Sequence, residues 1–205
     1  AVVSGAMAVI PALLLALMRL SKKKVIQCVS GAYIAVFRST PLLVQLSIIY
    51  FGLFTAISIP RITILGFVDL SRFIPGVVAL ALNSSAYVAE IFRAGILAVD
   101  KGQTEAARSL GLSSWQSMRL VVLPQAIKNV LPALANEVVT MVKESSICSM
   151  LGMAELMFVS KTVATGTYIT LAPYTIAALI YFCINYPASK AIEAIERRMR
   201  RGDKQ

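Results

Sequence analysis

Five apolar runs divide the chain, and polar segments that carry most of the charge separate them. The runs cover residues 1–20, 40–60, 73–97, 129–150 and 168–188. Each approaches the roughly 20 apolar residues that a helix needs to cross a bilayer, where a helix satisfies its own backbone groups. The pattern therefore predicts an all-α, polytopic membrane protein with about five transmembrane helices, in a single domain over residues 1–205.

The segments between the runs differ in character. Residues 57–76, ISIPRITILGFVDLSRFIPG, mix β-branched residues with Pro60, Gly66 and Pro75, which predicts an external loop with a short strand or an interfacial piece. Residues 189–205 form a predicted amphipathic tail, whose Ile192 and Ile195 can lie along a membrane while its arginines meet anionic lipid. The first 20 residues lack the basic start of a secretory signal, so we interpret them as the remainder of a first spanning helix.

Composition supports a membrane protein. The chain is 58% hydrophobic and 15% charged, whereas soluble domains are about 45–50% apolar and about 25% charged. Its net charge of +10 could suggest a nucleic-acid partner, but the cations do not gather into a patch with aromatic readers. We therefore expect no nucleic acid among the partners.

The cations instead indicate orientation. Of 20 Lys and Arg residues, fourteen lie in segments 19–28, 98–128 and 189–205, whereas Arg61, Arg72 and Lys161 lie in the loops on the other side. The remaining three, Arg38, Arg93 and Lys143, lie in or at the ends of the runs. The positive-inside rule then predicts the N terminus outside and the C terminus in the cytoplasm.

The longest predicted cytoplasmic connection, residues 100–125, has the composition of short helices. Residues 104–110 are expected to be helical, with Glu105 near the positive N-terminal end and Gly111 in the left-handed position just past the C terminus. Ser113 and Gln116 match a capping box that starts a second helix, and Leu123-Pro124 is expected to limit it.

The result would be two short helices that meet at Gly111, here called the knuckle (residues 100–125). It would expose Ala106 and Ala107 and would be suited to insertion in a partner's groove. A solvated loop that merely joins two spans is the alternative.

Charged and amide side chains within the runs are further candidates, because ionisable groups in a membrane are costly unless paired. Glu90 and Arg93 have the i,i+3 spacing of a helical ion pair. The adjacent Lys143 and Glu144 point to different sides of a helix, so one must face a cavity, another chain or a polar interface. Asn83-Ser84-Ser85-Ala86-Tyr87 interrupts the third run, either as hydrogen bonds between helices or as the lining of a pathway.

Several kinds of chemistry are excluded. The chain has no histidine, and Cys28, Cys148 and Cys183 are widely separated, so neither a Ser-His-Asp site nor a metal-ligand spacing occurs. The phosphate loop G-x-x-x-x-G-K-[ST] is also absent from the sequence. We therefore expect no catalytic residues, metal or cofactor, and energy for any transport must come from another polypeptide. An ion-coupled transporter, a passive channel and a structural membrane subunit stay open as alternatives.

The 100–125 segment resembles the EAA signature of ABC-importer permeases. Glu105-Ala106-Ala107, three residues, Gly111, nine residues, and then Val121-x-Leu123-Pro124 follow its spacing, with Val121 in place of the usual isoleucine. FRSTPLLVQLSIIYFGL (37–53), LNSSAYVAEIFRAGI (82–96) and NEVVTMVKESS (136–146) are similar to the polar amino acid permease class of type I importers. Ser39 replaces the glycine usual in F-R-G-T-P, and the first helix is shorter than usual.

The resemblance implies an amino acid importer in a bacterial or archaeal inner membrane. Its implied partners are two cytoplasmic ABC ATPase subunits, a second permease subunit in a homo- or heterodimer, and an extracytoplasmic solute-binding protein. The implied ATPase-coupling residues are Glu105, Ala106, Ala107, Gly111, Leu123 and Pro124. The candidates for contacting the amino acid are Asn83, Ser84, Tyr87, Glu144 and Glu155.

Overall fold

The computed structural model describes residues 1–57, 62–64, 66 and 68–201, which are mostly helical as predicted. The first half contains α1 (Val2–Arg19), α2 (Lys24–Ser39), α3 (Leu42–Ser47), the π-helix η1 (Ile48–Phe54), strands β1 (Thr63–Ile64) and β2 (Val68–Asp69), and α4 (Leu70–Leu97). The second half contains α5 (Lys101–Ser109), α6 (Ser114–Ser117), the π-helix η2 (Met118–Val122), α7 (Leu123–Glu144), the 3-10 helix η3 (Ser145–Leu151), α8 (Leu156–Thr167) and α9 (Leu171–Arg201).

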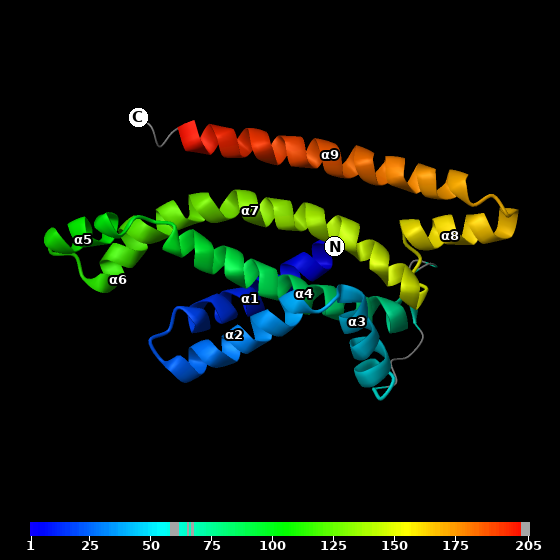
Figure 1. Ribbon diagram of the computed structural model, residues 1–205, viewed down its shortest axis with the longest axis horizontal. Helices are drawn as coiled ribbons and strands as arrows, with labels where there is room; N and C mark the ends of the chain where they lie inside the picture. Colours follow the sequence, from blue (N-terminus) through cyan, green and yellow to red (C-terminus); the bar gives the residue numbers. More distant parts are fainter. Residues whose placement is uncertain (58–61, 65, 67, 202–205) are drawn as a thin grey trace.

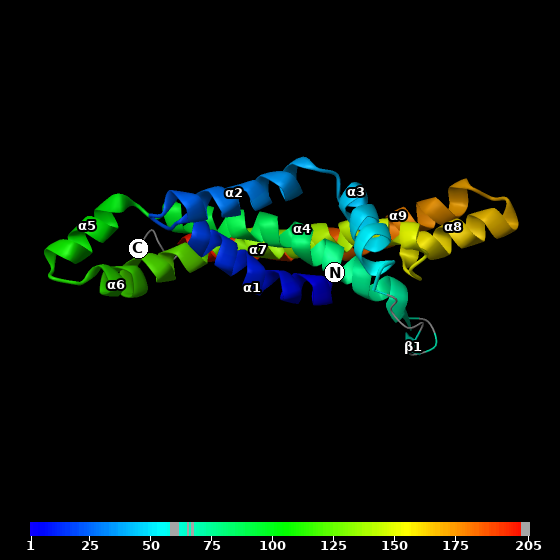
Figure 2. The ribbon, with the colours of Figure 1, turned by 90° about the horizontal axis from the view of Figure 1, so that it is seen from below.

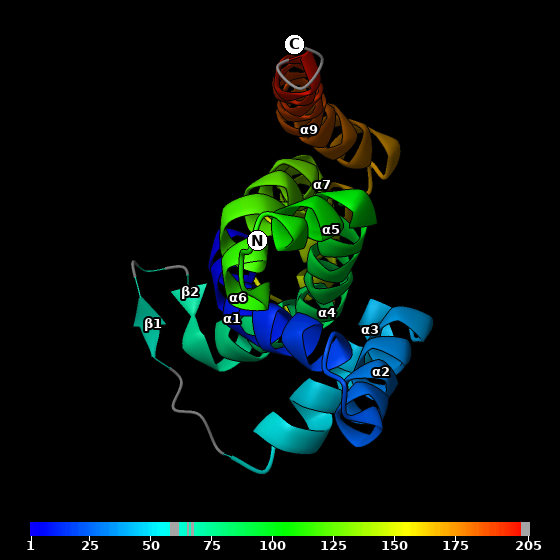
Figure 3. The same ribbon diagram turned by 90° about the vertical axis from the view of Figure 1, so that its left-hand side faces the viewer.

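The long helices lie in layers. α4 and α7 run side by side through the centre, α1 packs on α4, and α9 runs along the opposite side of α7 (Figures 1 and 2). Seen from the α5–α6 end, α9 lies on one side of the α4–α7 pair and α1, α2 and α3 lie on the other (Figure 3). α5 and α6 form one end of the molecule, and α8 lies at the other.

Three helices are long and apolar enough to cross a membrane, and the count reaches five if two bent pairs each form one crossing. The three are Val2–Arg19, Leu70–Leu97 and Leu171–Met199. The bent pairs are Lys24–Ser39 with Leu42–Phe54, at 106°, and Ser114–Leu151 with Leu156–Thr167, at 48°. This agrees with about five crossings.

The second crossing differs from the predicted run of 40–60. Its helix begins at Lys24 and breaks before Leu42, because Thr40 adopts an extended conformation with φ −113° and ψ 143° ahead of Pro41. The tail also differs, because residues up to Arg201 continue α9 as one helix rather than forming a separate element.

The α1–α4 contact is built from small residues. α1 buries Ser4, Ala8, Ala12 and Ala16, one every fourth position. Ala12 and Ala16 share a core cluster with Ala86 and Ala89 of α4. Without bulky side chains in between, two backbones can approach closely, which is how membrane helices commonly associate.

The predicted external loop contains a short antiparallel hairpin. Thr63 pairs with Asp69, and Ile64 pairs with Val68. The Asp69 carboxylate then accepts a 2.9 Å hydrogen bond from the Ser71 amide, so α4 begins at Leu70. Pro60 and Arg61 of this loop lie outside the described residues.

Candidate functional site

The 100–125 segment begins with a longer helix than expected. The Asp100 carboxylate accepts a 2.7 Å hydrogen bond from the Gly102 amide, which caps α5 and starts it at Lys101 rather than 104. Glu105 therefore lies in the middle of α5, so its predicted place beside the positive helix end is wrong.

The end of α5 is as predicted. Gly111 has φ +87°, the left-handed region that glycine adopts without steric cost. The Leu112 amide donates a 3.2 Å hydrogen bond to the Ala107 carbonyl. Arg108 Nη1 donates a 2.9 Å bond to the Leu112 carbonyl. Since nothing lies within 4 Å of a Cβ built at Gly111, glycine is required here by conformation rather than by space.

The capping box of α6 is confirmed. The Ser113 amide donates to Gln116 Oε1 at 2.8 Å, and the Gln116 amide donates to Ser113 Oγ at 3.2 Å.

The expected stop at Leu123-Pro124 is wrong, because α6 runs through η2 directly into α7. The Leu123 amide reaches back five residues to the Met118 carbonyl, and Pro124 falls in the first turn of α7. This widened turn precedes the proline, whose missing amide costs little at a helix start. The helix after Gly111 therefore continues without a break into α7, at the centre of the molecule, whereas α5 ends before Gly111.

The two alanines of the segment differ. Ala106 is exposed as predicted, but Ala107 is buried, which corrects the expectation that both are exposed. Leu110 and Trp115, at the tip, are 83% and 69% exposed. The α5–α6 end thus presents Ala106 and large apolar side chains on a frame that two capping motifs hold rigid.

Asn83 and Ser84 are buried and hydrogen-bonded inside the chain. Asn83 Nδ2 donates to Gln45 Oε1 at 2.9 Å, and Ser84 Oγ donates to Glu137 Oε1 at 2.9 Å. Gln45 and Glu137 were missed as site residues. An amide and a carboxylate within apolar helices were the available signal.

Tyr87, Glu90 and Arg93 follow Ser84 along α4. The Glu90–Arg93 ion pair is confirmed: Arg93 Nε donates to both Glu90 oxygens at 3.0 Å, and Arg93 Nη2 donates to Oε1. The Arg38 guanidinium lies 5.4 Å from the centroid of the Tyr87 ring, a cation–π contact.

Glu155 and Glu144 lie near the α8 end. The Glu155 carboxylate caps α8, accepting from the amides of Met157 and Phe158 at 2.8 and 2.7 Å, and it also accepts from the Tyr181 hydroxyl at 3.3 Å. Glu144 is half-buried, whereas its neighbour Lys143 is exposed.

The five candidates do not share one pocket. Glu155 lines a pocket of about 240 Å³ with Ser4 and Cys148, and Tyr87 lines another of about 450 Å³.

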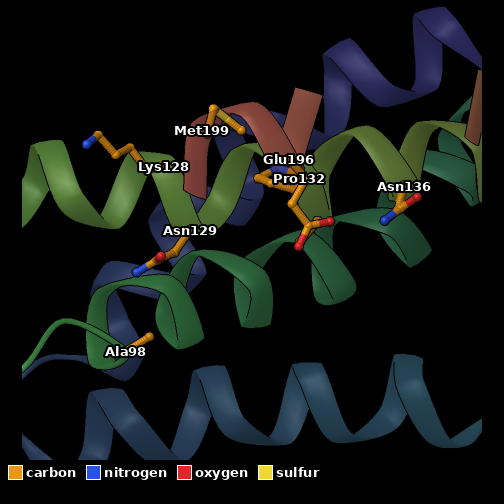
Figure 4. Close-up of a pocket in the computed structure, with 8 residues that line it drawn as sticks. Ala98, Lys128, Asn129, Pro132, Asn136, Glu196 and Met199 are labelled. Atoms are coloured by element: carbon orange, nitrogen blue, oxygen red, sulfur yellow. The ribbon is translucent and has the colours of Figure 1, made fainter. Parts of the chain in front are cut away.

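A further pocket, of about 390 Å³, lies between α7 and α9. Lys128, Asn129 and Asn136 of α7 border it together with Glu196 and Met199 of α9 (Figure 4). Asn129 Nδ2 donates a 3.5 Å bond to the Gly95 carbonyl of α4. Sequence reasoning missed this site, because only the packing of α9 on α7 brings these residues together.

Comparison with known proteins gives consistent matches over nearly the whole chain. The sequence profile of the family described as "Binding-protein-dependent transport system inner membrane component" matches residues 8–201. The arginine transport system permease protein ArtQ of Bacillus subtilis is 41% identical over 98% of this chain and 88% of its own length. The protein of Rickettsia typhi named "Putative glutamine transport system permease protein GlnP" is 43% identical over 91% of this chain and 82% of its own length.

Solved structures agree with these relatives. The crystal structure of an amino acid ABC transporter with histidines superposes with a TM-score of 0.85 at 48% identity, covering 96% of this chain and 87% of that one. An inward-facing structure of the MetNI methionine ABC transporter superposes with a TM-score of 0.75 at 20% identity, covering 96% and 89%. The second likeness shows the fold alone.

Proposed function

The chain belongs to the family of binding-protein-dependent transport system inner membrane components, and we propose that it is the permease subunit of an ATP-driven ABC importer for polar or charged amino acids. It forms half of the translocation pathway in an inner membrane. It carries out no catalysis itself, because a separate ATPase hydrolyses the ATP. The observation that carries this proposal is the rigid, exposed α5–α6 knuckle, in a chain 48% identical to a subunit of an amino acid ABC transporter.

The knuckle is the proposed contact with the ATPase. Glu105 and Ala106 lie on its exposed face and contact the partner. Ala107, which is buried, and Gly111, which has a positive φ, set its shape.

Leu123 and Pro124 lie where the knuckle joins α7, so they carry its displacement into the centre of the permease. ATP binding then draws two such knuckles together and opens the route on one face, and hydrolysis returns it to the other.

Asn83, Ser84, Tyr87, Glu144 and Glu155 are the proposed solute contacts. Their hydroxyl, amide and carboxylate groups match the ammonium and carboxylate of an amino acid, and a carboxylate suits a cationic side chain best. Ser84 already donates to Glu137, so we add Glu137 as the group that positions its hydroxyl. Support for this set is its placement on α4, α7 and the cap of α8, within or beside the apolar crossings.

The proposed assembly has two ATPase subunits, a second permease that is a copy or a homologue, and an extracytoplasmic binding protein that delivers the solute. Lipid and the second permease cover the large apolar side chains that α1 and α9 expose. The charge asymmetry supports an N terminus outside and a cytoplasmic C terminus.

Reconstitution tests this proposal. The permease is co-expressed with an ABC ATPase from the same organism and placed in liposomes with the solute-binding protein. ATP hydrolysis is expected to rise with liganded binding protein and to drive uptake of the labelled amino acid. Uptake by the permease alone, driven by an ion gradient or none, would show instead that it is an ion-coupled transporter or a channel.

A further inference from the structure

The pocket of about 450 Å³ that Tyr87 lines is also polar. It lies between the end of α1, the second half of α2 and residues 87–90 of α4. Arg19, Arg38, Ser39, Tyr87 and Glu90 supply its polar lining. Of these, only Tyr87 belongs to the proposed solute contacts.

The pocket holds more positive charge than the chain neutralises. Glu90 is the one carboxylate in its lining, and Arg93 already binds both of its oxygens. Within the residues that the structure describes, Arg19 and Arg38 take part in no ion pair. Arg19 and Arg38 therefore line the pocket without a carboxylate partner of their own among the described residues.

The two arginines are held in place by the fold. Arg19 Nη1 donates a 3.4 Å bond to the Gln27 carbonyl and lies 3.0 Å from where a Cβ on Gly31 would be. Its Nε is buried and has no hydrogen-bond partner among the described residues. The Arg38 guanidinium rests over the Tyr87 ring, which leaves its N–H groups free to donate in the plane of the fork.

The pocket reaches from the end of α1 to the far end of α2. Arg38 is fourteen positions after Lys24, which at 1.5 Å per residue is roughly 20 Å along α2, within a candidate crossing. An arginine within a crossing is costly unless a polar or negative partner lies against it. The guanidinium fork matches the two oxygens of a carboxylate or phosphate, and the Ser39 hydroxyl adds a further donor.

We propose that this pocket binds an oxyanion, a carboxylate or a phosphate, between Arg19 and Arg38. Two molecules available to a membrane protein carry this group: a phospholipid, through its phosphate, and an amino acid, through its α-carboxylate. The lipid source is independent of the proposed function, whereas the amino acid source rests on it.

The test uses the complete importer, with its ATPase subunits, in nanodiscs. In the lipid arm, the melting midpoint is compared between pure phosphatidylcholine and phosphatidylcholine with phosphatidylglycerol. In the solute arm, in pure phosphatidylcholine, calorimetry compares L-arginine and L-glutamine with their carboxamides, which lack the negative charge. The variants are Arg19→Gln and Arg38→Gln. Lys161→Gln, which removes an exposed charge of α8, is the control.

The wild-type complex is expected to show either a higher melting midpoint with phosphatidylglycerol or tighter binding of the amino acids than of their carboxamides. Each arginine variant then loses the rise in midpoint, or loses roughly tenfold in affinity. Lys161→Gln is expected to behave like the wild-type complex. The inference fails if neither arm gives a response, if both arginine variants respond like wild type, or if Lys161→Gln loses as much. It also fails if the effect of Arg38→Gln is to separate the two permease subunits. Arg38 would then contact the second permease subunit and not an oxyanion. If neither arm gives a response while ATP-driven uptake persists, this inference is overturned and the proposed function stays intact.

Discussion

Arg72 Nη1 donates a 2.6 Å hydrogen bond to the carbonyl oxygen of Gly152, a residue 80 positions later in the chain. The bond fastens the start of α4 to the turn between η3 and α8. Gly152 has φ +71°, and a Cβ added to it would lie 2.5 Å from Arg72 Nη1. The turn therefore depends on glycine for both its conformation and its contact.

Gly152→Ala is expected to destabilise the permease by about 1–3 kcal/mol, because it combines a strained φ with displacement of Arg72. Arg72→Ala is expected to cost about 1–2 kcal/mol through the lost hydrogen bond. Since both changes break one contact, the double variant should lose less than the sum of the two. Melting midpoints of the four proteins in detergent check this, and strictly additive losses would contradict the coupling.

Gly95→Ala is expected to loosen the crossing of α4 and α7. A Cβ there would collide with Val130 Cγ2, and overpacking of this kind costs about 1–3 kcal/mol. Gly52→Ala is the matched control, because nothing lies within 4 Å of its Cβ position. The Val130→Ala change should restore part of the stability of Gly95→Ala. An equal midpoint for Gly95→Ala and Gly52→Ala would argue against a close crossing.

Ala106→Leu should weaken coupling to the ATPase, whereas Ala107→Leu should lower stability. Ala106 is exposed, so its enlargement should leave the melting midpoint unchanged while lowering ATPase stimulation by liganded binding protein about tenfold. Ala107 is buried, so a larger side chain should cost about 1–3 kcal/mol of stability before any effect on coupling. Parallel midpoints and ATPase rates decide between the two. Full stimulation in a stable Ala106→Leu complex would remove Ala106 from the docking surface.

Gly111→Val should uncouple hydrolysis from uptake while leaving membrane insertion intact. A β-branched residue at φ +87° costs about 1–2 kcal/mol locally and should reshape the tip of the knuckle. Gly111→Asn is the control, because asparagine adopts this conformation more readily. The ratio of solute imported to ATP hydrolysed measures the effect. If the valine variant transports as well as the asparagine variant, the shape of the tip is not needed for coupling.

Glu144→Gln and Glu155→Gln separate solute binding from structure. Glu144 is the N-cap residue of η3, but its carboxylate accepts no capping hydrogen bond, so its neutralisation should raise KM for a cationic amino acid about tenfold with an unchanged midpoint. Glu155 caps α8 with two hydrogen bonds, so its replacement should also lower stability by about 1 kcal/mol. Uptake kinetics and melting midpoints are measured on both. Wild-type KM in both variants would return these carboxylates to a structural role.

Structural features formed by residues close together in the chain could be predicted from the sequence. The apolar runs predicted about five crossings, which agrees with the three to five that the helices allow. The Ser113–Gln116 capping box, the left-handed Gly111 and the Glu90–Arg93 pair were predicted correctly. Each of these three rests on groups within about one helical turn, where spacing alone brings them together.

Two helix boundaries were predicted wrongly, because more than one residue near each boundary can start or end a helix. Pro124 was expected to end a helix, but a π-turn before it lets α6 pass into α7. Glu105 was predicted to lie near the start of a helix at residue 104, but Asp100 caps α5 and the helix begins at Lys101. At Pro124 a backbone hydrogen bond from Leu123 to Met118 decided the outcome, and at the start of α5 the Asp100 side-chain cap decided it.

The partners in the long-range hydrogen bonds were decided only by the tertiary structure. Asn83 meets Gln45, Ser84 meets Glu137 and Arg72 meets Gly152 across 38, 53 and 80 positions. Which alanine of the knuckle is buried likewise depends on what packs beneath α5. Periodicity determines which side of a helix is polar, but the crossing of two helices determines which polar groups touch. That crossing depends on small residues such as Ala86 and Gly95, whose close packing involves the whole chain.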